Sequence, residues 1–164
     1  RFTSLSHSMS NETPGQPRPI EILLVEDNEA DLVLTKRALQ RSAKVTNRVA
    51  VAHDGAEALD YLFRRGAFAQ ATPPDLVLLD LNLPKFSGLE VLQQIKSNPA
   101  TSHLPVIIMT GSDAEADIGK AYSLHASCYL TKPVKLESFL KAVASLADFW
   151  LTIVKLPTVV NDKR

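Results

Sequence analysis

Four apolar runs in this chain stop at polar residues, and their positions limit the fold more than any other feature. The runs are IEILLV, DLVLL, PVIIM and CYLT, and they are followed by Glu26 and Asp27, by Asp80, by Thr110 and by Lys132. A short apolar run between polar residues is typical of a strand that is buried on both faces of a parallel sheet. Ligands of such sheets bind beyond the carboxyl ends of the strands, so we expect these five side chains to meet at one edge.

The pattern around these runs predicts alternating strands and helices. It implies an α/β fold, a doubly wound parallel sheet of five strands flanked by five helices, in a single domain. Asp54 is placed to cap the second helix, and Arg64, Arg65 and Gly66 are placed to end it. The expected strands are 20–26, 45–51, 75–80, 104–110 and 127–131, and the expected helices are 28–42, 55–65, 87–97, 113–124 and 135–154.

Composition divides the chain into three parts. Residues 1–19 are rich in Ser, Pro, Gln and Asn without periodicity, which predicts a flexible arm, and residues 1–8 are an expression scar if Met9 is the natural start. We expect the folded domain at 20–147. Residues 148–164 would extend the last helix and end in a tail.

The last helix carries apolar residues on two faces. One stripe, which includes Trp150, follows a 3.6-residue period, whereas Phe149, Ile153 and Leu156 lie roughly 100° away. A second apolar face near a chain terminus favours contact beyond the domain's own core, so we expect these four residues to form a homodimer or partner interface. The alternative is a tail that folds back over its own domain.

Charge and cysteine content argue against several classes of protein. The chain has 18 basic and 18 acidic residues and no basic run, which argues against general nucleic-acid binding. No apolar stretch reaches the roughly 18 residues that span a membrane, and the N-terminus lacks the apolar core of a signal peptide. The one cysteine, Cys128, excludes a disulfide framework, and a reducing cytoplasm fits.

The acidic residues at the strand ends predict a metal site. The clustered carboxylates of Glu26, Asp27 and Asp80 would repel one another unless a cation held them together. Mg²⁺ prefers oxygen ligands and keeps some of its waters, and the backbone carbonyl of Asn82 can supply a further ligand. An ordinary alternative is that the acidic pair, or Asn28, only caps the following helix.

The other strand-end residues predict phosphoryl chemistry at Asp80. A carboxylate is able to attack phosphorus and form an acyl phosphate, provided that nearby cations offset the repulsion between two anions. Lys132 would bring a point charge to the phosphoryl oxygens, and Thr110 a hydroxyl that hydrogen-bonds to one of them. Each residue alone is more often structural or solvated, so the prediction depends on their joint occurrence.

The segments that carry these residues resemble those of response-regulator receiver domains in two-component signalling. They are LLVEDN, LVLLDLNLPKFSG, VIIMTGS and YLTKP, and the resemblance covers about four-fifths of the chain. It implies a flavodoxin-like receiver fold in which Asp80 accepts a phosphoryl group from the phosphohistidine of a sensor histidine kinase. It also implies Mg²⁺, for which Mn²⁺ can substitute, as the cofactor. The residues that the resemblance assigns to the metal and the phosphoryl group are Glu26, Asp27, Asp80, Asn82 through its carbonyl, Thr110 and Lys132.

The resemblance extends to a conformational switch. Tyr129 lies three residues before Lys132, where the family carries a switching aromatic side chain. When Thr110 moves towards the phosphoryl group, the Tyr129 ring would rotate inwards and alter the surface formed by the fourth helix, fifth strand and fifth helix. A tyrosine merely packed at a strand edge is the alternative.

Two further features resemble the regulators that partner bacterial phytochromes. LHASCYLTKPV places His125 where many receivers have a helix-ending glycine, and an extended tail such as FWLTIVKLP supports homodimers in that group. Because the chain ends near the fifth helix, we expect no DNA-binding or enzymatic output domain. The expected role is that of a signalling phosphoacceptor, with self-catalysed phosphotransfer and autodephosphorylation at most, and not that of an enzyme.

Other functions fit the same architecture less well. A phosphohydrolase with an aspartate nucleophile usually carries a second acid two residues later, where this chain has Asn82. A flavin- or nucleotide-binding module would need a glycine-rich phosphate loop after the first strand, and none follows it. A receiver-like scaffold that no longer takes phosphate is a further alternative, although the intact acidic set argues against it.

Overall fold

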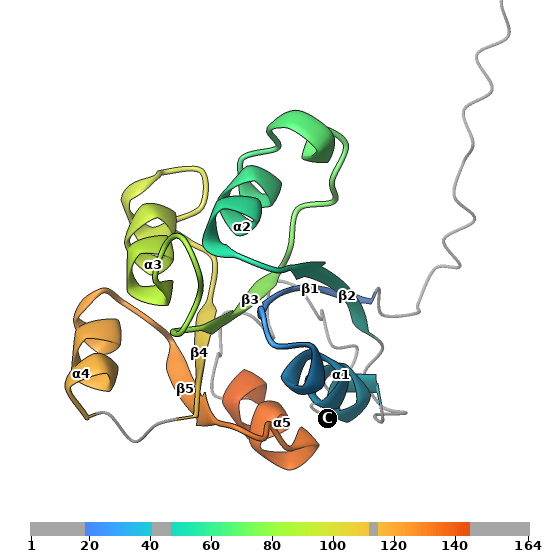
Figure 1. Ribbon diagram of the computed structural model, residues 1–164, viewed down its shortest axis with the longest axis vertical. Coiled ribbons are helices and arrows are strands. Elements are labelled where there is room, and N and C mark those ends of the chain that lie inside the picture. Colours follow the sequence, from blue (N-terminus) through green and yellow to red (C-terminus); the bar gives the residue numbers. More distant parts are fainter. Residues whose placement is uncertain (1–18, 41–46, 112–114, 145–164) are drawn as a thin grey trace, which may run out of the picture.

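The computed structural model describes residues 19–40, 47–111 and 115–144, which form an α/β unit around a five-stranded sheet (Figure 1). Neighbouring strands are parallel, in the order β2-β1-β3-β4-β5, so the doubly wound fold predicted from the sequence is confirmed. The elements are β1 (Ile20–Val25), α1 (Glu29–Gln40), β2 (Asn47–Ala52), α2 (Gly55–Leu62), the 3₁₀ turn η1 (Gly66–Phe68), β3 (Leu76–Asp80), α3 (Gly88–Ser97), β4 (Val106–Thr110), α4 (Glu115–Ser123), β5 (Cys128–Thr131) and α5 (Leu136–Ala144).

Helices cover both faces of the sheet and create two apolar cores. In Figure 1, α1 and α5 lie on one side of the strands, and α2, α3 and α4 lie on the other. Side chains alternate along β1, so Ile20, Ile22 and Leu24 belong to the core with α1 and α5. Leu23 and Val25 belong to the core on the opposite face. Burial on both sides holds the sheet rigid and thereby fixes the ends of its strands.

The edge strands depart from the predicted burial. β1 and β3 are almost completely buried, as the apolar runs predicted. β2 is mostly half-buried, and alternate residues of β5 are exposed. The prediction of burial on both faces is therefore wrong for CYLT, because β5 lies at the edge of the sheet, where the helical layers cover it only in part.

The second helix begins as predicted but ends earlier. Oδ1 of Asp54 accepts a hydrogen bond at 2.7 Å from a backbone N–H in the first turn of α2, which confirms the predicted cap. The helix ends at Leu62, and Arg64 adopts the left-handed conformation that stops it, with a φ of 54°. Gly66 lies beyond this turn and begins η1, so the prediction that this glycine ends the helix is wrong.

His125 takes the conformation that a glycine usually provides after a helix. Its φ is 68°, and the N–H of Ala126 donates to the carbonyl of Ala121 at 3.0 Å, which closes the end of α4. The histidine therefore preserves the turn before β5.

Several expectations concern parts of the chain outside the described residues. They are the arm before residue 19, the helix beyond residue 144, and the interface formed by Phe149, Trp150, Ile153 and Leu156. The boundaries of the three predicted parts of the chain thus stay predictions. Among the helices of the described ranges, none combines the length and apolarity that crossing a bilayer requires.

Candidate functional site

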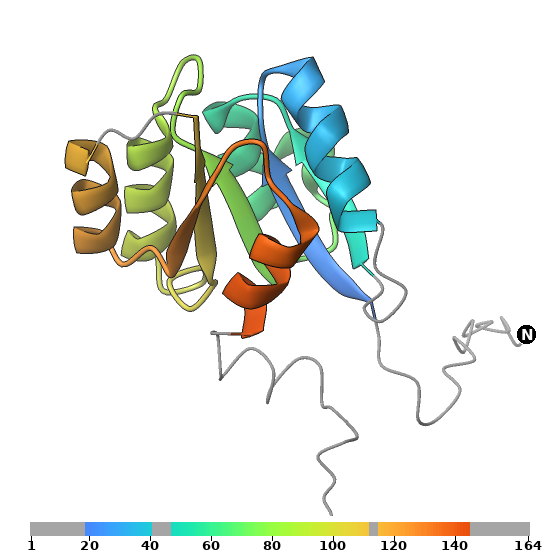
Figure 2. The ribbon, with the colours of Figure 1, turned by 90° about the horizontal axis from the view of Figure 1, so that it is seen from below.

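The loops after β1, β3 and β5 lie at the same edge of the sheet (Figure 2). β1 and β3 are neighbours, and the chain continues from β1 to β2 on the other side, which makes this the topological switch point. Glu26 and Asp27 follow β1, and Asp80 ends β3. The structure brings these three carboxylates together, with one oxygen of each within 4.8 Å of the others.

Glu26 is fully buried and held on several sides. Its N–H donates to the carbonyl of Ala52 at 3.0 Å, and its Oε1 accepts a hydrogen bond from the N–H of Asn28 at 3.1 Å. Its Oε2 receives no directed hydrogen bond but lies 2.5 Å from Nζ of Lys132, so this contact is an ion pair. Burial raises the pKa of Glu26 to about 7 against the opposing effect of Lys132, and Asp80 adds to the rise.

Asp80 is fixed by the loop that follows it. Its Oδ1 accepts a hydrogen bond from the N–H of Asn82 at 2.9 Å, and its Oδ2 accepts one from Nζ of Lys132 at 2.6 Å. The loop closes because the N–H of Gly88 donates to the carbonyl of Leu81 at 3.0 Å. A Cβ on Gly88 would lie 2.3 Å from the backbone oxygen of Asp80, so only glycine allows α3 to approach this closely.

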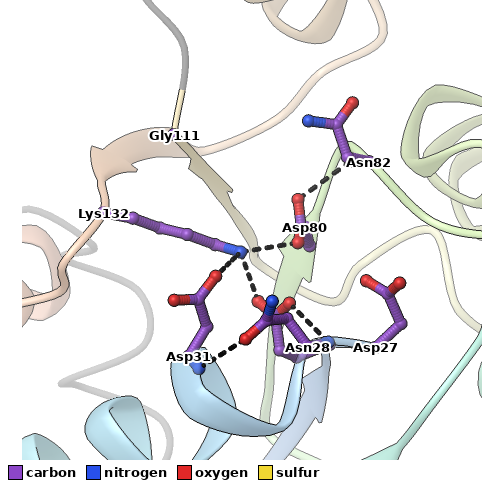
Figure 3. Close-up of a pocket in the computed structure, with 8 residues that line it drawn as sticks. Asp27, Asn28, Asp31, Asp80, Asn82, Gly111 and Lys132 are labelled. Carbon is purple, nitrogen blue, oxygen red and sulfur yellow. Dashed lines mark hydrogen bonds and ion pairs between the residues drawn. The ribbon is translucent and has the colours of Figure 1, made fainter.

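Lys132 reaches across the site from the end of β5 and contacts three carboxylates (Figure 3). Its Nζ lies 2.5 Å from Oε2 of Glu26, 2.6 Å from Oδ2 of Asp80 and 3.0 Å from Oδ2 of Asp31. Burial alone would lower the pKa of this lysine, but hydrogen bonds to the carboxylates outweigh it and hold the pKa of Lys132 above its ordinary value. The peptide bond to Pro133 is cis.

Asp31 is a further residue of the site that the sequence pattern did not predict. This residue lies in the first turn of α1, where its N–H donates to Oδ1 of Asn28 at 3.0 Å. Asn28 is therefore the cap of α1, which leaves Glu26 and Asp27 for another role. The available signal was an acid one helical turn after Asp27, at the end of the helix that faces the site.

The residues around the site fit a hard divalent cation. A cavity of about 280 Å³ is lined by the four acidic residues together with Lys132, Asn28, Asn82 and Gly111. The three neighbouring carboxylates match the oxygen preference of Mg²⁺. One of their oxygens, Oε2 of Glu26, is buried and accepts no directed hydrogen bond. The role of the Asn82 carbonyl as a metal ligand stays a prediction.

The two proposed switch residues are placed by β4 and β5. The backbone of Thr110 ends β4 opposite Thr131 of β5, and the side chain of Thr110 lies outside the described part of the structure. Tyr129 is 41% exposed, and its ring meets that of Tyr122 edge to face, with 6.0 Å between the centroids. The Tyr129 ring thus faces outwards, and its role in a switch stays a prediction.

Comparison with known proteins identifies the family. Residues 22–144 match the response regulator receiver domain, and the chain therefore belongs to that family. The resemblance drawn from the four sequence segments is confirmed.

The relatives include response regulators, two of which are phytochrome response regulators. Response regulator Rcp1 of Synechocystis sp. is 42% identical over 139 residues, which cover 85% of this chain and 94% of Rcp1. The structure of its Mn²⁺-bound form has a TM-score of 0.68 and covers 85% of this chain and 100% of that one. The bacteriophytochrome response regulator AtBRR has 45% identity and a TM-score of 0.73, covering 82% and 96% of the two chains. The phosphorylated cyanobacterial phytochrome response regulator RcpA has 44% identity and a TM-score of 0.69, with the same coverage of 82% and 96%.

Proposed function

We propose that Asp80 accepts a phosphoryl group from the phosphohistidine of a sensor histidine kinase. The contact between Asp80 and Lys132, in a cavity lined by further carboxylates, is the observation that carries the proposal. The carboxylate of Asp80 is buried except for its access to the cavity, and the positively charged ammonium group of Lys132 lies beside it. The phosphorylated state of the relative RcpA supports the same chemistry.

The transfer requires only positioning and charge compensation. One oxygen of Asp80 forms the new P–O bond while the P–N bond of the phosphohistidine breaks, and the imidazole leaves with that electron pair and takes up a proton. Lys132 would turn from the carboxylate of Asp80 to a phosphoryl oxygen. The hydroxyl of Thr110 would donate a hydrogen bond to another.

The proposed metal ligands are Glu26, Asp27, Asp80 and the backbone carbonyl of Asn82. A bound Mg²⁺, or Mn²⁺ in its place, would offset the negative charge of the carboxylate and the incoming phosphoryl group. The acidic cluster supports this assignment, because its buried Oε2 of Glu26 accepts no directed hydrogen bond. The Mn²⁺-bound form of the relative Rcp1 supports it as well.

The proposed partners are a phytochrome-type sensor kinase and a second copy of the chain. We expect these contacts in the cytoplasm, and we expect no nucleic acid among the partners. The phytochrome regulators among the relatives support the first partner. Phosphorylation would draw Thr110 towards Asp80, let Tyr129 rotate inwards, and so change the surface of α4, β5 and α5. The dimer would use this surface together with Phe149, Trp150, Ile153 and Leu156.

We assign a signalling role rather than an enzymatic one. A phosphohydrolase of this architecture would need a second acid at the position of Asn82, which here offers an amide. A scaffold that takes no phosphate would not need a lysine held against a buried aspartate. Both alternatives predict that Asp80 carries no lasting phosphoryl group, and the experiment below separates them from the proposal.

The test is incubation with Mg²⁺ and acetyl phosphate, followed by intact-mass spectrometry. The wild-type chain should gain one phosphoryl group, and Asp80→Asn should gain none. Asp60→Asn is a matched control, because Asp60 forms an exposed ion pair with Arg65 away from the site. An adduct of equal yield in Asp80→Asn would place the phosphoryl group elsewhere and remove the proposal.

A further inference from the structure

Lys132 has one carboxylate partner that stands outside the predicted metal site. Its three partners are Glu26, Asp80 and Asp31, whereas the group suited to a cation consists of Glu26, Asp27 and Asp80. Within the described residues, no ion pair joins Lys132 to Asp27. Asp31 thus contacts the ammonium without belonging to the group suited to a cation, whereas Asp27 belongs to that group and makes no ion pair with Lys132 among the described residues.

The close-up of the site shows this division in space. In Figure 3, the Lys132 side chain ends between Asp31 and Asp80, while Asp27 lies on the far side of Asp80 from Asp31. The backbone of Asp31 is anchored in the first turn of α1, where its N–H donates to Oδ1 of Asn28. Its carboxylate does not belong to the group suited to a cation, so it stays available to Lys132 when the other oxygens change partners.

We infer that Asp31 is a positioning residue that keeps the Lys132 ammonium beside Asp80 when a divalent cation occupies the site. The inference rests on the proposed function. A cation bound to Glu26 and Asp80 would repel the ammonium from both residues. Asp31, 3.0 Å from Nζ, offers the remaining contact that the cation does not share.

The retained contact matters when the phosphoryl group arrives. Lys132 then has to meet a phosphoryl oxygen on Asp80, and a side chain tethered at Asp31 starts close to that position. Without the Asp31 charge, a lysine repelled by the cation would spend more time in solvent, and phosphorylation would slow. The Asp31 side chain is 37% exposed, so screening by water keeps the effect moderate.

The first test compares Asp31→Asn with Asp60→Asn, using acetyl phosphate as donor and saturating Mg²⁺. We expect phosphorylation of Asp31→Asn to be about fivefold slower than that of the wild type, as for the loss of a partly exposed ion pair. Asp60→Asn should react at the wild-type rate. If Asp31→Asn also reacts at the wild-type rate at saturating Mg²⁺, the inference is overturned.

The second test repeats Asp31→Asn in a Lys132→Ala background, where labelling is followed over longer times. Because Asp31 acts through Lys132, its substitution should have no further effect on the rate there. An equal loss in both backgrounds would show that Asp31 acts on the cation or on folding instead. A wild-type chain that takes no phosphoryl group would refute the proposed function, whereas a labelled wild type with an unaffected Asp31→Asn would refute this inference alone.

Discussion

Nζ of Lys132 lies 2.6 Å from Oδ2 of Asp80. The ammonium group that is proposed to bind the phosphoryl group therefore already offsets the negative charge of the proposed phosphoacceptor. Lys132 follows β5 and Asp80 ends β3, and β4 lies between these strands in the sheet. The contact therefore spans the edge where the strands end. One consequence is that a divalent cation has to compete with the ammonium for the same oxygens.

Replacing Lys132 should strengthen metal binding. In Lys132→Ala the proposed metal ligands Glu26 and Asp80 lose the ammonium that competes with the metal ion for their oxygens. We expect Mg²⁺ to bind about tenfold more tightly, a change of about 1.4 kcal/mol in binding free energy. Isothermal titration calorimetry measures the affinity directly. Lys120→Ala, which removes an exposed charge from α4, is the control and should leave the affinity unchanged. A weaker affinity in Lys132→Ala would mean that the lysine assists the metal site.

Gly88 and Gly119 should respond in opposite ways to the same substitution. A Cβ on Gly88 would lie 2.3 Å from the Asp80 backbone oxygen, so Gly88→Ala should lower the free energy of unfolding by about 3 kcal/mol or more. Gly119 lies in helix α4 with no atom within 4 Å of an added Cβ, so Gly119→Ala should raise that free energy by about 0.5–1 kcal/mol. Urea unfolding compares the two variants, and similar behaviour would contradict the packing described for the loop after β3.

The charge on Asp54 should stabilise the fold in a defined pH range. The N–H of Glu57 lowers the pKa of Asp54, and Lys85, 3.0 Å away, lowers it further. Because the folded-state pKa is depressed, the stabilisation is present above the unfolded pKa of about 3.9 and is lost as pH falls through the folded value. Asp54→Asn keeps a capping side chain but not the charge. Its deficit in unfolding free energy, about 0.5–1 kcal/mol at neutral pH, should shrink below about pH 4. A deficit that grows in acid would contradict the sign.

The strand-end residues were predictable because their signal is local. Glu26, Asp27 and Asp80 each follow an apolar run directly, and parallel strands bring such positions to one edge. The role of Asp31 was not predicted, because its partner Lys132 lies 101 residues away and because acidic residues are common at helix N-termini. The contact that gives it a role exists only in the folded chain.

The local sequence also gave wrong predictions for the end of helix α2 and for the burial of strand β5. Arg64 and Gly66 both have a positive φ, of 54° and 58°, but the hydrogen bonds that close the helix end at Arg64 and Arg65, so position rather than residue type decides where α2 stops. The apolar character of CYLT resembled that of a central strand. Strand order, which places β5 at the edge, is a property of the whole sheet and leaves little trace in one segment.

The proposed dimer depends on the apolar residues near the end of the chain. We expect Phe149→Ala combined with Ile153→Ala to weaken a dimer detected by light scattering after size-exclusion chromatography, because both changes remove apolar area from the predicted interface. Leu34→Ala, at an exposed apolar position on α1, is the control and should leave the dimer intact. A wild-type chain that stays monomeric at high concentration, with or without phosphate, would remove the dimer from the proposal.

Reduction of the acyl phosphate tests the assignment of Asp80 most directly. The chain is phosphorylated with acetyl phosphate and Mg²⁺ and then treated with borohydride, which converts a phosphorylated aspartate into homoserine. Peptide sequencing by tandem mass spectrometry should locate the homoserine at position 80 and nowhere else among the acids of the site. Homoserine at position 27 or 31, reduction of Glu26 to the corresponding 2-amino-5-hydroxypentanoic acid, or no homoserine at position 80 in a chain that carries phosphate would contradict the proposed function.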